Sequence, residues 1–399
     1  MTSAPPAVGV DPRLRSAHRA TAAAFIGSGF AFASWASRIP QVRDQLHLDA
    51  AGLGLVLLAI AAGSVLALPL SGPVVAHWGT RRTTAGMALL LGLALVGVAV
   101  GHRYGVAPLV VALFLLGFGN GAWDVGMNVH GADVEQRLGR AVMPRYHAGY
   151  SVGTVAGALV GTAMVALDVP VTVHLLVVGV LVAVVVPLWV RRFLPHEPHP
   201  HAAHEGGAAR RSLAAWTEPR TLLVGLFVLA FAFTEGTAND WLSVAVIDGY
   251  AAPPAVGTLA FAVFLAAMTA ARWFGPALLD RFGRVPVVRG LAVVAVGGLL
   301  LFVFGPSVPV AVAGALLWGA GASLGFPVGM SAGSDEPARA AARVSVISSI
   351  GYCAFLGGPP LIGLLGQHLT VLHALTAVVV LLGVAAAIAG ALRPLPTGG

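Results

Sequence analysis

Twelve long apolar segments constrain the fold of this chain more than any other feature. A helix needs about 20 apolar residues to cross the hydrocarbon core of a bilayer. Inside that core, only helices and closed barrels can satisfy their own backbone hydrogen bonds. The segments cover residues 20–38, 50–75, 83–101, 106–130, 146–167, 170–190, 221–246, 254–279, 286–304, 309–331, 342–365 and 371–392. They predict an all-α polytopic membrane protein with twelve transmembrane helices.

The composition agrees with this class of protein. Hydrophobic residues make up 57% of the chain and charged residues 10%, whereas soluble domains carry about 25% charged residues. The net charge of +7 could suggest nucleic-acid binding. The basic residues instead sit in short loops between apolar segments, which argues against a nucleic-acid surface. All 23 basic residues are arginines, so a Walker lysine, and with it an ATP-driven pump, is excluded.

The distribution of arginines predicts how the chain lies in the membrane. With the N-terminus inside, nineteen arginines fall in inner loops and tails. The outer loops take only Arg38, Arg43 and Arg103, and Arg272 lies within a helix. Because cytoplasmic loops carry the excess of basic residues, both termini are expected in the cytoplasm. The arginine-only, alanine-rich usage suggests a bacterial protein, and therefore a multi-pass protein of the bacterial cytoplasmic (inner) membrane.

A polar stretch at residues 191–220 divides the apolar segments into two sets of six, 1–190 and 221–399. Short motifs recur in the two halves about 203 positions apart, namely Gly79 with Gly283, Val125-Gly126-Met127 with Val328-Gly329-Met330, and Gly149-Tyr150 with Gly351-Tyr352. Two halves of the same orientation joined by a cytoplasmic linker form the parallel-repeat plan of a rocking transporter. The linker histidines (His196, His199, His201 and His204) show no ordered ligand spacing, so no metal site is expected.

The loops after the second and eighth apolar segments resemble the G-x-x-x-D-R-x-G-R-R/K signature of the major facilitator superfamily. The matching residues are Gly72, Gly79, Arg81 and Arg82 in the first copy and Asp280, Arg281, Gly283 and Arg284 in the second. In the first copy Ala76 and His77 replace the acid and the first arginine, and in the second Pro276 replaces the first glycine. The resemblance implies the twelve-helix fold of this superfamily and a cytoplasmic gate motif at these residues.

Two further stretches look like the fucose-permease-like (FHS) branch of the superfamily and its uncharacterised bacterial relatives. They are MNVHGADVE, which follows the fourth apolar segment, and EGTANDW in the seventh. The resemblance implies that helices 1, 4, 7 and 10 line a central cavity. It also implies that a solute crosses the membrane by alternating access at that cavity.

Two acids within the apolar segments are the candidate proton-coupling residues. A charged acid at mid-bilayer costs roughly 3 kcal/mol on insertion scales, and acids that occur there are usually functional. Asp124 lies in the fourth segment and Glu235 in the seventh. Burial favours the neutral form of a carboxylic acid, so either side chain could carry a proton. The alternative is a buried hydrogen bond that only holds the helices in place.

The candidate substrate-binding residues are amides, an acid and two indoles in the first, fourth and seventh apolar segments. Asn120, Asp124 and Asn128 recur every four residues, which places them on one face of a helix. The full set is Asn120, Asn128, Asn239, Asp240, Trp35 and Trp241. The amides could instead join helices, and the tryptophans could form an interfacial belt, which is the preferred interpretation for them.

Three other features have structural interpretations. Arg38 is expected to extend to the membrane interface, and Arg272 to do the same or to pair with a loop acid. Gly153, Gly157 and Gly161 form a ladder of small residues that predicts close helix packing, and a gliding contact is the role suggested for it.

The sequence as a whole predicts a secondary active transporter of a small polar solute, such as a sugar, coupled to protons as a symporter. A proton-driven antiporter that exports a drug or metabolite uses the same acids and stays open as an alternative. A non-transporting membrane sensor is the third possibility. No catalytic residues, metal or cofactor are expected. The expected partners are the solute, protons and the lipid bilayer, with no nucleic acid, and the chain is expected to act as a monomer.

Overall fold

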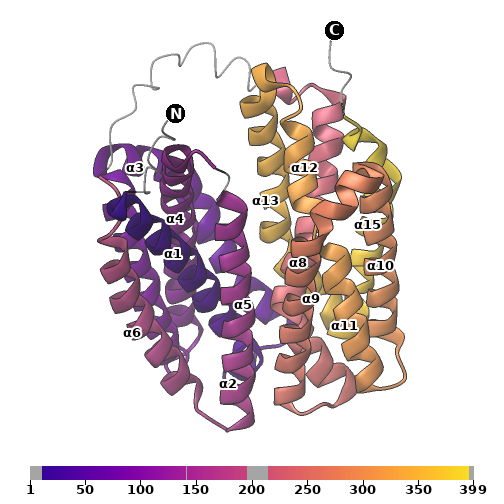
Figure 1. Cartoon of the computed structure of the whole chain (residues 1–399). Helices are drawn as coiled ribbons and strands as arrows, with labels where there is room; N and C mark the ends of the chain where they lie inside the picture. Colours follow the sequence, from indigo (N-terminus) through magenta and orange to yellow (C-terminus); the bar gives the residue numbers. More distant parts are fainter. Residues whose placement is uncertain (1–10, 141, 196–213, 395–399) are drawn as a thin grey trace, which may run out of the picture.

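The computed structural model of the chain describes residues 11–140, 142–195 and 214–394 (Figure 1). Five helices form the first six crossings, because α3 crosses twice. They are α1 (Pro12–Ala36), α3 (Ala50–Gly101), α4 (Val106–Leu138), α5 (Met143–Ala166) and α6 (Val171–Val190), and the short α2 (Ile39–Gln45) follows α1. The next three are α8 (Pro219–Tyr250), α9 (Pro254–Phe282) and α10 (Arg284–Phe304). The tenth combines α11 (Val308–Ala322) and α12 (Gly325–Gly333), and the eleventh is α13 (Pro337–His368). The last combines α14 (Val371–Ala374), α15 (Thr376–Ile388) and η1 (Ala389–Leu392).

These helices confirm the predicted all-α architecture with about twelve crossings. Ten helical stretches are long and apolar enough to span a bilayer, and α3 is one of them. At 52 residues and about 1.5 Å per residue, α3 is long enough to cross twice. With α1, the described residues provide twelve crossings.

Two glycines at matching positions turn the chain between consecutive crossings. Gly79 lies within α3 with φ 77° and ψ 161°. Gly283, 204 positions later, separates α9 from α10 with φ 79° and ψ 168°. This region of backbone conformation is essentially restricted to glycine. The glycine common to both copies of the loop motif therefore has a backbone role.

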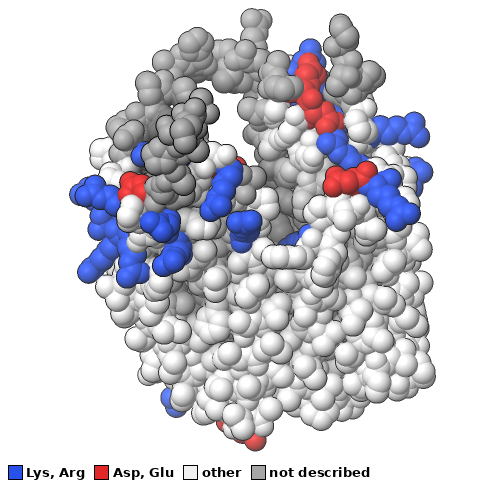
Figure 2. All heavy atoms as spheres, viewed as in Figure 1, with Lys and Arg blue, Asp and Glu red and all other residues white. Residues whose placement is uncertain are grey.

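The helices form two groups side by side, α1 to α6 and α8 to η1 (Figure 1). Contacts between the groups are made where α5 packs against α9 and where α3 packs against α13. Figure 2 shows most arginines at the end of the molecule where α1 begins and α6 and η1 end. We call this the arginine-rich end and the other the opposite end. The band between them shows no charged side chain on this face, as expected of a surface in lipid.

The glycine ladder of α5 packs against α1 within the first group. A Cβ on Gly153 would lie 2.1 Å from the Ile26 carbonyl oxygen, and one on Gly157 would lie 2.5 Å from that of Phe30. The prediction of close helix packing is therefore confirmed. The suggested gliding contact is wrong, because both helices belong to the same group.

We expect Gly153→Val to lower the free energy of unfolding in detergent by about 3 kcal/mol or more, because a backbone carbonyl occupies the space that its side chain needs. Thermal unfolding followed by tryptophan fluorescence measures the effect. Gly86→Val is the matched control, since a Cβ at Gly86 meets nothing within 4 Å. Equal losses in the two variants would show that α1 and α5 do not depend on this contact.

Candidate functional site

A cavity of about 1180 Å³ lies between the two groups of helices. Its walls come from α1, α4 and α5 on one side and from α9 and α12 on the other. Asp280 and Arg284, where α9 ends and α10 begins, line it at the arginine-rich end. Figure 2 shows the molecule hollowed between the groups at this end. A solute in this cavity would contact both groups at once.

Asp124 lines the cavity from α4. The Asn128 amide donates to the Asp124 carboxylate at 3.0 Å and to its carbonyl oxygen at 2.8 Å. No arginine or histidine among the described residues lies within ion-pair distance of this carboxylate. Because no fixed cation neutralises it, Asp124 can gain or lose a proton without breaking an ion pair.

Glu235 is held differently, by an ion pair to Arg272. The Arg272 Nη2 atom lies 2.7 Å from Glu235 Oε2, and Arg272 Nε donates to the Ser323 carbonyl oxygen at 3.0 Å. The two charged side chains are 27% and 23% exposed, and Arg272 lines the cavity. The expectation that Arg272 extends to the interface or pairs with a loop acid is wrong, because its partner is the acid of the seventh crossing.

Two α5 side chains line the cavity close to these charges. Tyr150 lies within electrostatic range of Asp124, Glu235 and Arg272, and His147 within range of Arg272. Both belong to the cavity wall. Tyr352, the repeat partner of Tyr150, also lies within range of Asp124. In the sequence these two tyrosines stand out only as a repeat, and a polar side chain at the same place in both halves was the signal that could have singled out Tyr150.

The remaining substrate-binding candidates do not line this cavity. Asn120 accepts a hydrogen bond from Ser28 at 3.4 Å. Asn239 has a buried amide oxygen with no described partner, and Asp240 beside it is half-buried. Trp35 and Trp241 are 2% and 0% exposed. The expected interfacial belt is therefore wrong for both tryptophans, which lie in the protein core.

Polar contacts join the two groups at the opposite end. Arg43, in α2, forms an ion pair with Asp248 at the end of α8, with Nη2 2.9 Å from Oδ1. Gln367 of α13 donates to Asp49 at 3.0 Å and accepts from the Ala51 amide at 3.2 Å. The cavity is thus open at the arginine-rich end, and the groups are held together at the other.

Comparison with known proteins identifies the family. The sequence profile of the Major Facilitator Superfamily matches residues 20–354. The chain belongs to the Major Facilitator Superfamily. The predicted resemblance to this superfamily is confirmed.

Within the superfamily, an uncharacterized transporter of Sinorhizobium fredii, y4wD, is 33% identical over 361 residues, which cover 90% of this chain and 93% of the relative. The crystal structure of the nucleoside transporter NupG matches 94% of this chain and 98% of its own, with a TM-score of 0.75 at 14% identity. The crystal structure of the E. coli fucose:proton symporter FucP matches 95% of this chain and 98% of its own, with a TM-score of 0.63 at 14% identity. The two structures support the fold alone.

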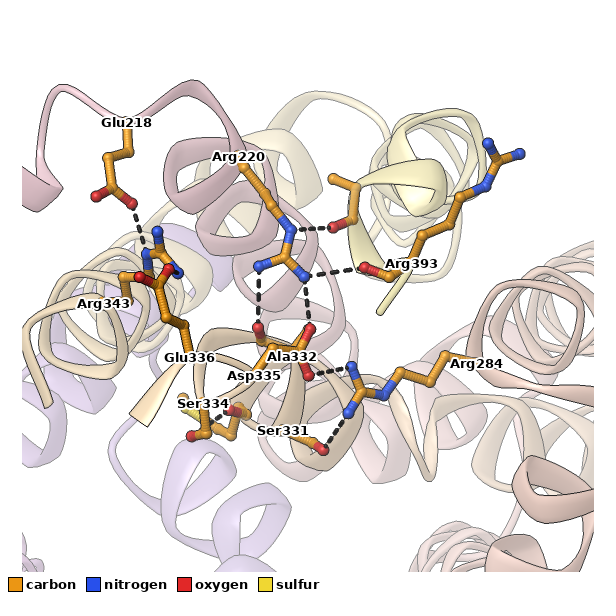
Figure 3. A network of polar contacts seen from close by, with 12 residues as sticks. Glu218, Arg220, Arg284, Ser331, Ala332, Ser334, Asp335, Glu336, Arg343 and Arg393 are labelled. Carbon is orange, nitrogen blue, oxygen red and sulfur yellow. Dashed lines mark hydrogen bonds and ion pairs between the residues drawn. The ribbon is translucent and has the colours of Figure 1, made fainter. Parts of the chain in front are cut away.

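The superfamily loop motif forms a charge network in its second copy only. Arg284 contacts the Asp335 carboxylate and the Ser331 hydroxyl at 2.7 and 2.9 Å. Figure 3 shows Asp335 between Arg284 and Arg220, whose Nη2 lies 2.7 Å from the other carboxylate oxygen. The remaining motif positions Gly72, Arg81, Arg82, Asp280 and Arg281 are exposed. The first copy therefore contributes its turn glycine, Gly79, but no ion pair among the described residues.

We expect Asp335→Asn to lower the free energy of unfolding by about 2 kcal/mol, because it leaves two half-buried arginines without their common carboxylate. The Asp335 side chain is 11% exposed. Chemical unfolding in detergent measures the loss. Asp280→Asn is the control, because that carboxylate is exposed and forms no ion pair with a described residue, so the loss should be below about 0.5 kcal/mol. Similar losses in both variants would contradict a central role for Asp335.

No group of histidine, cysteine and acidic residues in the described parts of the chain could hold a metal ion. The four linker histidines lie outside the described residues. Among the described residues, the site of this superfamily member is therefore a cavity with two acids that make no ion pair, Asp124 on α4 and Asp280 at the arginine-rich end, together with the Glu235–Arg272 pair and histidine and tyrosine side chains.

Proposed function

We propose that this superfamily member is a proton-coupled secondary transporter that moves a small organic solute by alternating access. The observation that carries the proposal is the unpaired Asp124 carboxylate in the wall of a cavity shared by both groups of helices. A carboxylic acid in such a place changes charge when it exchanges a proton, and a charge change alters the stability of the open and closed forms. Asp124 is the proton carrier in this mechanism.

Glu235 and Arg272 would act as the second charged element of the site. While paired, they present a nearly neutral unit to the cavity. A solute with an anionic or strongly polar group could compete for Arg272, and Glu235 would then take up a proton. Asn128 would hold the Asp124 side chain in place for proton exchange. The arginine-rich end would face the cytoplasm under the positive-inside rule, and the transporter would act as a monomer in the bacterial inner membrane.

Symport of a polar solute and export of an amphipathic one use the same acids, and the apolar part of the cavity wall suits the second of these. Phe25, Met127, Trp273, Phe326 and Met330 line it, and none of the candidate asparagines does. Aromatic and methionine side chains adapt to varied apolar ligands. An antiporter that expels an amphipathic solute is therefore the second candidate, on this observation.

Proton flux into proteoliposomes that contain a pH-sensitive dye tests the proposal. Hexoses, deoxy sugars, polyols and amphipathic cations are added in turn. Symport predicts that one polar solute drives acidification of the lumen. Antiport predicts that an amphipathic solute drives proton movement in the opposite direction. If no solute on the panel, and no imposed pH gradient, produces coupled movement, a proton-coupled transporter of these solute classes is contradicted and the sensor remains.

A further inference from the structure

A second cleft, of about 800 Å³, lies at the opposite end of the molecule. The first group supplies most of its wall, through α2 and the segments that follow α3 and α5. The second group supplies Pro253, Pro254 and Ala255 at the start of α9. No residue lines both this cleft and the central cavity. The proposed transport mechanism makes no use of it.

A buried arginine that has no acidic partner among the described residues lies in the wall of this cleft. Arg38 is 2% exposed, so the expectation that it extends to the membrane interface is wrong. Its Nε donates to His174 Nδ1 at 2.9 Å and its Nη2 to the Val169 carbonyl oxygen at 3.0 Å. Because His174 accepts through Nδ1, its ring carries the proton on Nε2 and is neutral. Neither partner of Arg38 therefore carries a negative charge.

Buried arginines are nearly always paired with an acid, because an unpaired buried charge is strongly unfavourable. Arg38 makes no ion pair with any described residue. Burial lowers the pKa of its guanidinium to about 10, so it stays charged at neutral pH. Its third nitrogen, Nη1, makes no hydrogen bond to the described part of the chain and remains able to donate.

A second polar side chain in the same wall also lacks partners. Gln41, one turn after Arg38, has both its amide nitrogen and its amide oxygen buried without a hydrogen bond in the described structure. Buried polar groups in folded proteins are normally satisfied. Arg103 lines the cleft with an exposed side chain, and so does one carboxylate, that of Asp168. With two arginines and one acid, the lining keeps a net positive charge.

We propose that this cleft binds a phosphate-type oxyanion, with Arg38 as the buried anchor, Arg103 at the rim and Gln41 bonded to an oxygen of the ligand. Phosphate matches the donor geometry of a guanidinium. The apolar wall formed by Pro170, Val171 and Pro253 has room for the carbon skeleton of an ester. The ligand is therefore either the headgroup of an anionic lipid or a free phosphate compound.

Because the wall includes residues of both groups, a bound oxyanion would stabilise the form in which the opposite end is closed. A ligand shifts a conformational equilibrium only as far as its affinity differs between the two forms. This cleft would lose the contacts to Pro253 and Pro254 when the groups separate. The site would therefore regulate the cycle without taking part in solute binding.

Thermal unfolding of the purified protein in neutral detergent, titrated with inorganic phosphate against chloride at equal ionic strength, tests the site. We expect phosphate to raise the Tm of the wild type in a saturable manner. This rise should be absent in Arg38→Gln and in Gln41→Leu. In Arg103→Gln it should require at least threefold more phosphate. Gln41→Leu should also raise the Tm without phosphate, because it removes an unsatisfied amide. Arg15→Gln is the control, since Arg15 is an exposed arginine at the arginine-rich end.

The exposed Arg103 and the amide of Gln41 keep the test informative if Arg38→Gln fails to fold. If Arg103→Gln and Gln41→Leu both respond to phosphate as the wild type does, the proposal is overturned. Native mass spectrometry of protein released from phosphatidylglycerol or phosphatidylcholine nanodiscs identifies the source. If the wild type retains phosphatidylglycerol and both Arg103→Gln and Gln41→Leu lose it, the ligand is a lipid headgroup. A phosphate effect without lipid retention indicates a free anion.

Discussion

Replacing Asp124 with asparagine should abolish concentrative transport while leaving solute exchange intact. One proton moving down a potential of 100 mV supplies about 2.3 kcal/mol, which corresponds to roughly fifty-fold accumulation of a solute. Asparagine keeps the size of the side chain but cannot carry a proton. We therefore expect the accumulation ratio in proteoliposomes to fall from as much as about fifty to about one, with exchange of labelled solute continuing.

Asp133→Asn is the matched control for this experiment. Asp133 lies on the same helix, α4, and forms an ion pair with Arg137 four residues away. It does not line the cavity. This variant should accumulate solute as the wild type does. If Asp124→Asn also accumulates solute normally, Asp124 has only a structural role, in which its carboxylate accepts the hydrogen bond of Asn128.

Arg272→Gln is expected to destabilise the protein and stop transport, because it leaves Glu235 as an unpaired charge between helices. Breaking a fully buried pair costs about 3–5 kcal/mol. Arg272 lines the cavity, and both side chains are about one quarter exposed, so we expect a loss of about 1–3 kcal/mol in the free energy of unfolding. Glu235→Gln combined with Arg272→Gln should restore the free energy of unfolding but leave transport at least tenfold slower.

A double-mutant cycle by chemical unfolding separates these effects, and transport is measured on the same proteins. The exposed pair of Arg339 and Glu336, whose atoms lie 3.5 Å apart, provides a control cycle with an expected coupling below about 0.5 kcal/mol. A zero coupling between Glu235 and Arg272 would mean that their ion pair is unimportant for the fold. Normal transport by the double variant would remove the pair from the mechanism.

The sequence predicted the crossings well, because a length of about 20 apolar residues is a local property that the bilayer imposes. The turn glycines Gly79 and Gly283 were also predictable, since they recur in both halves within the same motif. Asp124 could be singled out because an acid in an apolar helix is costly wherever its partners lie. The crossings and Asp124 depend only on residues that are close in the sequence, and the glycines depend on the repetition of one short motif.

What the sequence did not predict depends on which helices pack together. The partner of Arg272 is Glu235 on a neighbouring helix, 37 positions away. The burial of Arg38 arises because His174 and Val169 approach it from the loop and helix after α5. The burial of Trp35 and Trp241 was also not predictable, because the position of a tryptophan along a helix does not show whether its side chain faces lipid or another helix. Side-chain chemistry alone cannot assign such partners.

The most direct test of alternating access is whether the two ends of the molecule move in opposite directions. Spin labels at Gln136 and Phe282 report on the arginine-rich end, and labels at Tyr104 and Leu369 on the opposite end, in a Cys353→Ser background. All four label positions are exposed. Arg43→Ala removes the ion pair to Asp248 that joins the groups at the opposite end. Electron–electron distance measurements should then show a longer Tyr104–Leu369 distance and a shorter Gln136–Phe282 distance. If the opposite end opens while the arginine-rich end stays as wide as before, the two groups do not rock about the central cavity, and alternating access is contradicted.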